Sequence, residues 1–166
     1  MFFLLFSLPC LGGMASGLLG RKIGVTGSHI ITTSAVMIAA ILSIIGFYEV
    51  VLCHSPVTIH LGDWVHSEVL TVSWSLTFDT LSMSIITTVL IISSLVHLYS
   101  IDYMSSDPHN QRFFSYLSLF TFFMVLLVSG DNYFVLFVGW EFIAVCSYLL
   151  INFWFTVIEA NKSAMQ

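Results

Sequence analysis

The chain has 166 residues, of which 58% are hydrophobic and only 8% are charged. A soluble domain carries about 25% charged residues, so this composition indicates a polytopic membrane protein. The net charge of −5 includes only four Lys and Arg residues, which argues against nucleic-acid binding. The three cysteines lie far apart without a C-x-x-C pair, and no glycine-rich nucleotide motif is present. This pattern argues against a zinc site, an iron–sulfur cluster or a bound nucleotide in this chain.

Five apolar stretches follow one another along the chain, and each is long enough to cross a bilayer. They are Phe2–Leu19, Ile30–Leu52, Thr80–Ile101, Phe113–Ser129 and Tyr133–Phe155. The first stretch lacks the positively charged start of a signal peptide, so we expect it to be a retained helix. The predicted fold class is therefore an all-α polytopic membrane protein of about five transmembrane helices, forming a single membrane domain over residues 1–166.

The positive charges predict an orientation for these spans. Arg21 and Lys22 lie between the first two spans, Arg112 lies before the fourth, and Lys162 follows the fifth, so all four fall on one side. The loops on the other side carry only acidic charges. By the positive-inside rule, the N-terminus lies outside and the C-terminus inside.

The longest loop connects the second and third spans on the outer side. Apolar and polar residues alternate both before and after Gly62-Asp63, which predicts a short β-hairpin with these two residues between its strands. Trp64 and Trp74 are expected near the membrane interface. Three histidines in and beside this hairpin lack a ligand spacing, so we expect them to be solvated and the chain to hold no metal.

Glu141 is the strongest candidate for a functional residue. It follows Tyr133 by eight residues, which at about 1.5 Å each puts it roughly 12 Å into a hydrocarbon core about 30 Å thick. An acid at that depth costs about 2.5–3.5 kcal/mol on insertion, and such residues usually serve as ion or proton sites. We expect Glu141 to act in a proton relay. The alternative is a protonated acid that hydrogen-bonds a neighbouring helix and serves packing alone. Its predicted helix face reads Phe134, Val138, Glu141, Val145, Tyr148, Asn152.

Two further candidates border the third span. His97 ends a polar stripe that could line a hydrated path, because His titrates near neutral pH. Interhelical hydrogen bonding is the alternative role for this stripe. Its members are Thr80, Ser84, Thr87, Ser94 and His97. Asp79 precedes the span, where an N-cap role is the simpler interpretation and a functional acid near the outer entrance is the other. In the first span, Gly13-x-x-x-Gly17 predicts close helix approach.

Four segments carry a resemblance to a known family. They are Ser94–Met104, Asp107–Phe114, Gly139-Trp-Glu141 and Ser147–Ile151. Together they resemble subunit 5 of mitochondrial respiratory complex I, an antiporter-like subunit of NADH:ubiquinone oxidoreductase, and Asp107–Phe114 looks like the fungal members. That family is built from two inverted five-helix repeats preceded by extra helices. The resemblance implies that this chain supplies three leading helices and the first two helices of the first repeat.

The resemblance also implies roles and partners. Glu141 matches a family glutamate that pairs with a lysine two helices later and controls proton uptake, while His97 and Asp79 match positions with less defined roles. The expected function is part of the distal proton-translocating subunit, which couples NADH:ubiquinone electron transfer to proton pumping. NADH, FMN, iron–sulfur clusters and ubiquinone are expected in other subunits, and other membrane-arm subunits, the remainder of this subunit and the lipid bilayer are expected partners. The expected location is the mitochondrial inner membrane, with the N-terminus toward the intermembrane space and the C-terminus toward the matrix.

Two departures accompany the resemblance. Ala144 stands where the family usually has glycine, and the chain ends at what resembles the approach to a sixth helix, before the pairing lysine. We therefore expect the basic partner of Glu141 to come from another polypeptide segment. Two other functions remain open on the sequence: a structural membrane module that carries no protons, and a cation/proton antiporter subunit without redox coupling.

Overall fold

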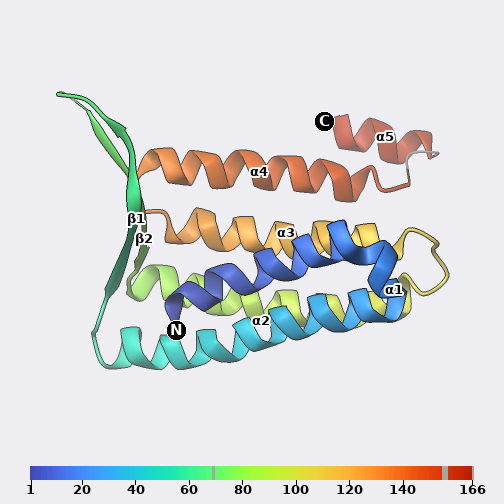
Figure 1. Cartoon of the computed structure of the whole chain (residues 1–166), viewed down its shortest axis with the longest axis horizontal. Helices are drawn as coiled ribbons and strands as arrows, with labels where there is room; N and C mark the ends of the chain where they lie inside the picture. The colour runs from blue at the N-terminus through green and yellow to red at the C-terminus, as the bar shows by residue number, and fades with distance from the viewer. Residues whose placement is uncertain (69, 155–156, 166) are drawn as a thin grey trace.

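The computed structural model describes residues 1–68, 70–154 and 157–165. Helices lie side by side, and a two-stranded hairpin crosses one end of them (Figure 1). The elements are α1 (Phe2–Phe47), the π-helical turn η1 (Tyr48–Leu52), β1 (Val57–His66), β2 (Thr71–Phe78), α2 (Thr80–Tyr103), α3 (Asn110–Ser129), α4 (Tyr133–Ile151) and α5 (Ile158–Met165). The predicted class, a helical membrane fold with one hairpin, is confirmed. The predicted end of the last span, Phe155, lies outside the described residues.

The first two predicted spans form one helical segment that folds back on itself. In the described part of the chain, four segments are long and apolar enough to span a membrane, and the first covers 51 residues as two helices joined at Gly24. A straight helix of that length would measure about 77 Å, more than twice the bilayer core. Instead the chain reverses at Gly24, whose φ of 81° and ψ of 174° only glycine adopts readily. Residues 20–29, which lie between the first two predicted spans, are therefore helical except at Gly24, where the chain turns.

The two limbs of α1, residues 2–23 and 25–47, run antiparallel in contact (Figure 1). A Cβ atom placed on Gly12 would lie 3.0 Å from the Cβ of Ala35. The hydroxyls of Ser16 and Ser28 are hydrogen-bonded nearer the turn. The two limbs together with α2, α3 and α4 give five bilayer-length segments, in agreement with the five predicted spans.

Glycine lines the face of the first limb that packs against α3. A Cβ on Gly13 would lie 3.0 Å from Leu119 Cγ, and one on Gly17 would lie 2.7 Å from Ser115 Oγ. The Ser115 hydroxyl donates to the Gly13 carbonyl at 2.7 Å. The close approach predicted for Gly13-x-x-x-Gly17 is confirmed, since a larger residue would push the two helices apart.

The hairpin differs from the prediction in its turn. β1 and β2 pair antiparallel, and Ser67 N donates to Leu70 O at 2.9 Å where the strands meet. Gly62 and Asp63 lie inside β1, where the pairing register shifts twice, and Gly62 has φ 155°. The alternation of apolar and polar residues identified the two strands. It did not locate the turn, because Gly62 lies at a β-bulge, where glycine's backbone freedom is used as it would be in a turn.

The core lies where the hairpin meets the helix ends. Buried side chains from α1, β2, α2, α3 and α4 form one apolar cluster there, and the rings of Phe2 and Phe78 lie 5.2 Å apart. α4 packs along α3 and turns its opposite face away from the bundle (Figure 1). The fold thus packs α3 along α4, while β2 and α5 contact α4 near its two ends, and this arrangement determines the surroundings of Glu141.

Candidate functional site

Glu141 lies in the middle of α4 on the face turned away from α3. Gly139 and Phe142 define the face of α4 that contacts α3. A Cβ added to Gly139 would lie only 2.8 Å from Leu127 Cα, and the Phe142 ring stacks on the Phe123 ring with 4.7 Å between their centroids. The Glu141 side chain is exposed, and no salt bridge reaches it from the described residues. Any group that pairs with this carboxyl group must therefore approach from outside the described bundle.

The uncovered face of α4 is otherwise mainly apolar. Phe134, Val145 and Tyr148 of the predicted stripe are exposed on it. Toward the far end, Asn152 Nδ2 lies 3.5 Å from the Tyr148 hydroxyl, while Asn152 Oδ1 is buried and has no hydrogen-bond partner among the described residues. A carboxyl group on such a surface is suited to a contact with a basic side chain of another helix, since pairing offsets the cost of placing the acid in lipid.

His97 is fully buried between α2 and α3 and belongs to a hydrogen-bonded network. Its Nδ1 lies 2.8 Å from the Ser93 carbonyl, which can only accept, so Nδ1 carries a proton. Nε2 lies 3.1 Å from the Ser118 hydroxyl, which donates to it in the neutral ring. The Ser93 hydroxyl contacts the Thr121 hydroxyl at 2.5 Å, and Thr121 donates to the Leu117 carbonyl. The network links two helices, whereas proton transfer by His97 stays a prediction.

The predicted stripe on α2 divides between different partners. Ser84 donates to the Thr80 carbonyl and Ser94 to the Ile91 carbonyl, both within α2 and at exposed positions. Thr87 also reaches the Ser43 carbonyl of α1, at 3.2 Å. The hydroxyls of the stripe therefore mostly satisfy their own helix, and only part of it faces the bundle interior.

Sequence reasoning missed a second buried polar contact near the Gly24 turn. His29 Nε2 lies 2.7 Å from Asn110 Oδ1, and Asn110 Nδ2 donates to the Met104 carbonyl at 2.7 Å. The Phe114 ring lies 4.5 Å from the His29 ring and 6.2 Å from the His97 ring. Asn110 and Ser118 lie on the buried face of α3, and this periodicity of polar residues was the available signal.

Replacing Ser118 by Ala is expected to lower the free energy of unfolding by about 1–2 kcal/mol, because His97 Nε2 would remain buried without a partner. Ser94→Ala removes a hydroxyl bonded to its own helix at an exposed position and should change stability little. Reversible unfolding in mixed micelles compares the two variants. Equal stabilities would show that the Ser118 contact contributes nothing.

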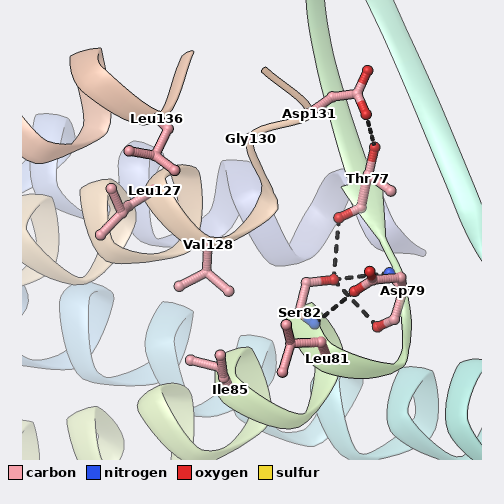
Figure 2. Close-up of a pocket in the computed structure, with 10 residues that line it drawn as sticks. All are labelled: Thr77, Asp79, Leu81, Ser82, Ile85, Leu127, Val128, Gly130, Asp131 and Leu136. Carbon is pink, nitrogen blue, oxygen red and sulfur yellow. Dashed lines mark hydrogen bonds between the residues drawn. The ribbon is translucent and has the colours of Figure 1, made fainter. Parts of the chain in front are cut away.

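Asp79 caps the N-terminus of α2 beside a cavity of about 360 Å³ at the hairpin end of the helices (Figure 2). Its Oδ1 accepts the Ser82 backbone N–H at 2.7 Å, and its own N–H donates to the Ser82 hydroxyl at 2.8 Å. The Ser82 N–H bond, the largest cause, lowers the pKa of Asp79 below its usual value. The capping box accounts for Asp79 structurally, and a role as a functional acid stays a prediction.

Asp131 lies at the same cavity and joins the α3–α4 connection to β2. Its carboxylate accepts the hydroxyl proton of Thr77 at 2.8 Å (Figure 2). It also accepts the hydroxyl proton of Ser75 at 2.9 Å, and the Asp131 N–H donates to the Ser75 carbonyl at 3.2 Å. On the sequence it was only one of the outer acidic charges. These bonds fix the start of α4 against the hairpin, and so they help to position Glu141.

Asp79→Ala removes the N-cap of α2 and is expected to lower the free energy of unfolding by about 1 kcal/mol. Because folding lowers its pKa, Asp79 stabilises the fold above its unfolded pKa, and this contribution is lost as the pH falls through the folded pKa. In Asp79→Asn the cap remains but cannot titrate, so part of the loss of stability below about pH 4 should disappear. Thermal unfolding at neutral and acidic pH measures both effects. Identical pH dependence of the wild type and Asp79→Asn would contradict the assignment.

Metal-ligand residues do not converge in the described ranges, where no three His, Cys, Asp or Glu side chains cluster. Of the loop histidines, His60 lies 3.4 Å from Asp63, and both side chains are largely exposed.

Comparisons with known proteins relate the chain to one subunit. Residues 64–114 match the family described as NADH-ubiquinone oxidoreductase (complex I), chain 5 N-terminus. NADH-ubiquinone oxidoreductase chain 5 of Mycosarcoma maydis is 61% identical over all 166 residues. The chain is similar throughout to an N-terminal part of chain 5. The chain 5 proteins of Rhizopus stolonifer, 57% identical over the whole chain, and Aspergillus niger, 57% identical over 99% of it, agree.

The chain spans about a quarter of the length of these chain 5 relatives, 25% in each case. The resemblance seen in the sequence, including its fungal style, is confirmed. Asp79 and His97 lie within the region that matches the chain 5 family, and Glu141 lies in the part aligned with the fungal relatives.

Proposed function

We propose that this chain forms part of a proton-translocating membrane subunit of NADH-ubiquinone oxidoreductase, in which electron transfer from NADH to ubiquinone drives proton movement. Its similarity over the whole chain to chain 5 of that enzyme supports the proposal. The observation that carries the chemistry is Glu141, an acid midway along a bilayer-length helix whose outer face is uncovered. An acid in that position is a proton site by default.

Glu141 would act as a proton carrier together with a basic side chain from another segment. A nearby cation favours the carboxylate, and its withdrawal in a low-dielectric setting favours the protonated acid. Small movements of such a partner would therefore load and unload a proton. The exposure of Glu141 on the uncovered face of α4 supports a partner from outside this bundle, such as the lysine that the resemblance implies.

The proposed setting is the mitochondrial inner membrane, with other membrane-arm subunits and the remainder of the subunit as partners. NADH, FMN, iron–sulfur clusters and ubiquinone belong to other subunits in this proposal. The N-terminus and the hairpin lie at one end of the helices, whereas the reversal of α1 and the connection to α3 lie at the other (Figure 1). Asp131 is hydrogen-bonded to the hairpin, and Arg21 and Arg112 line a pocket between the first limb of α1 and the start of α3. By the positive-inside rule the arginine end faces the matrix and the N-terminus faces the intermembrane space.

A structural role is the second candidate function, and the packing between α1, α2 and α3 favours it. The glycine face of α1 lets the helices pack closely, and both ring nitrogens of His97 have hydrogen-bond partners. These contacts stabilise helix association and require no proton movement. In that case the bundle would brace the assembly, and Glu141 would be a neutral hydrogen-bonding group.

Purification of the tagged chain in mild detergent tests the assembly. We expect it to copurify with flavin- and iron–sulfur-containing subunits, as a part of the oxidoreductase would. Purification without them would contradict the redox-coupled function and favour an antiporter without redox coupling. The ratio of protons translocated to NADH oxidised in Glu141→Gln then separates the carrier role from the structural one.

A further inference from the structure

A pocket of about 300 Å³ opens at the arginine end, between the first limb of α1 and the start of α3. Gly17 and Gly20 of the first limb line one wall of this pocket. Arg21 on one side and His109 and Arg112 on the other complete its polar rim. The fold therefore brings together two guanidinium groups that lie far apart in the sequence.

These positive charges have no counter-ion in the described structure. No carboxylate among the described residues lies within salt-bridge distance of Arg21 or Arg112. The adjacent acid, Asp107, instead accepts the His109 N–H at 3.0 Å and the Trp154 indole N–H at 2.8 Å. No side chain of the described residues caps the N-terminus of α3, whose free N–H groups add partial positive charge at the same place. The pocket is thus suited to an anion.

An apolar track on the surface leads to this pocket along the first limb. Leu11, Met14 and Leu18 are exposed, at 58%, 42% and 81%, and their spacing places them on one face of the helix. Arg21 follows Leu18 by three residues in the same helix and so lies on the same face, at the end of the track. A ligand that lies along this face would place its apolar part on the track and its anionic group between the arginines. A small anion without an apolar part would not contact Leu11, Met14 or Leu18.

We propose that this pocket binds the phosphate group of an anionic phospholipid, with an acyl chain along Leu11, Met14 and Leu18. Arginine binds phosphate through paired N–H donors, and basic residues at the end of a membrane helix attract acidic lipids. The site goes beyond proton transfer, because it involves the arginine end and not Glu141. Binding there would hold the turn of α1 against α3.

Native mass spectrometry of the full chain in non-ionic detergent tests the proposal, with dioleoyl phosphatidylglycerol and dioleoyl phosphatidylcholine as probes. The wild type should retain the anionic lipid preferentially. Arg21→Gln and Arg112→Gln should each reduce that preference by about fivefold, the usual weight of one basic residue near acidic lipid. Lys22→Gln is the matched control, since Lys22 is the next residue of the same helix and does not line the pocket. The preference of Lys22→Gln for the anionic lipid should equal that of the wild type.

Several results would overturn the assignment. Equal retention of both lipids by the wild type would exclude an anionic-lipid site. If Lys22→Gln lost as much of the preference for the anionic lipid as the arginine variants, the preference would come from the overall surface charge and not from this pocket. Full displacement of the lipid by inorganic phosphate would show a free-anion site. If a glutamine variant loses its helical circular dichroism, Arg21→Lys with Arg112→Lys replaces it. Lysine keeps the positive charge but lacks the paired N–H donors of arginine, so this variant should lose part of the lipid preference, and a preference equal to that of the wild type would contradict binding through the paired donors.

Discussion

Glu141→Gln in the assembled complex is expected to slow proton translocation by about 100-fold or more, the usual contribution of a positioned acid–base group. Gln has nearly the same size and is less costly to place in lipid, so α4 should insert and pack as before. The exposed position of Glu141, opposite the contact with α3, supports this expectation, because the bundle makes no described salt bridge to the carboxyl group. The measurement is the initial rate of proton uptake by vesicles at a matched rate of NADH oxidation.

Glu49→Gln is the control for this result. Glu49 is also an exposed acid, but it lies in the terminal turn η1, at the end of a span and not in its middle. Its replacement should leave translocation unchanged. Normal translocation by a fully assembled Glu141→Gln complex would rule out the carrier role and favour the structural module. Loss of the assembled complex itself would show a packing role for the carboxyl group.

Gly139→Leu is expected to lower the free energy of unfolding by about 3 kcal/mol, the upper end for an overpacked contact. A Cβ on Gly139 would lie 2.8 Å from the Cα and 2.9 Å from the backbone N of Leu127, so α3 and α4 would have to separate. Backbone atoms cannot move aside as a flexible side chain can. Unfolding in mixed micelles, followed by circular dichroism, measures the loss.

Ala144→Leu makes the matched comparison, because Ala144 lies on the same helix at an exposed position. It should change stability by less than about 0.5 kcal/mol. Similar stabilities of Gly139→Leu and the wild type would mean that α3 and α4 are not in close contact. Separation of these helices would also displace Glu141, so Gly139→Leu should impair proton translocation although the carboxyl group is intact.

The hydrophobic pattern was enough to identify the helices, and it located their ends to within a few residues. The predicted Thr80–Ile101 and Phe113–Ser129 correspond to α2 and α3, because long apolar runs in a bilayer have no stable alternative to the helix. Glycine was ambiguous. Gly24 makes a turn where a loop was expected, and Gly62 lies in a bulge where a turn was expected. The freedom of glycine to adopt positive φ serves both structures, and the sequence does not distinguish them.

The sequence by itself determined the class of the protein, its spans, the place of Glu141 midway along a helix and the Asp79 cap, because these depend on composition, hydrophobic pattern and local hydrogen bonding. Only the tertiary structure decided that His97 contacts Ser118, that His29 contacts Asn110, and that α4 presents Glu141 on an uncovered face. Those features depend on which faces of separate helices meet. That choice follows from the close glycine contacts of α1 and α4 with α3, which join residues distant in the chain.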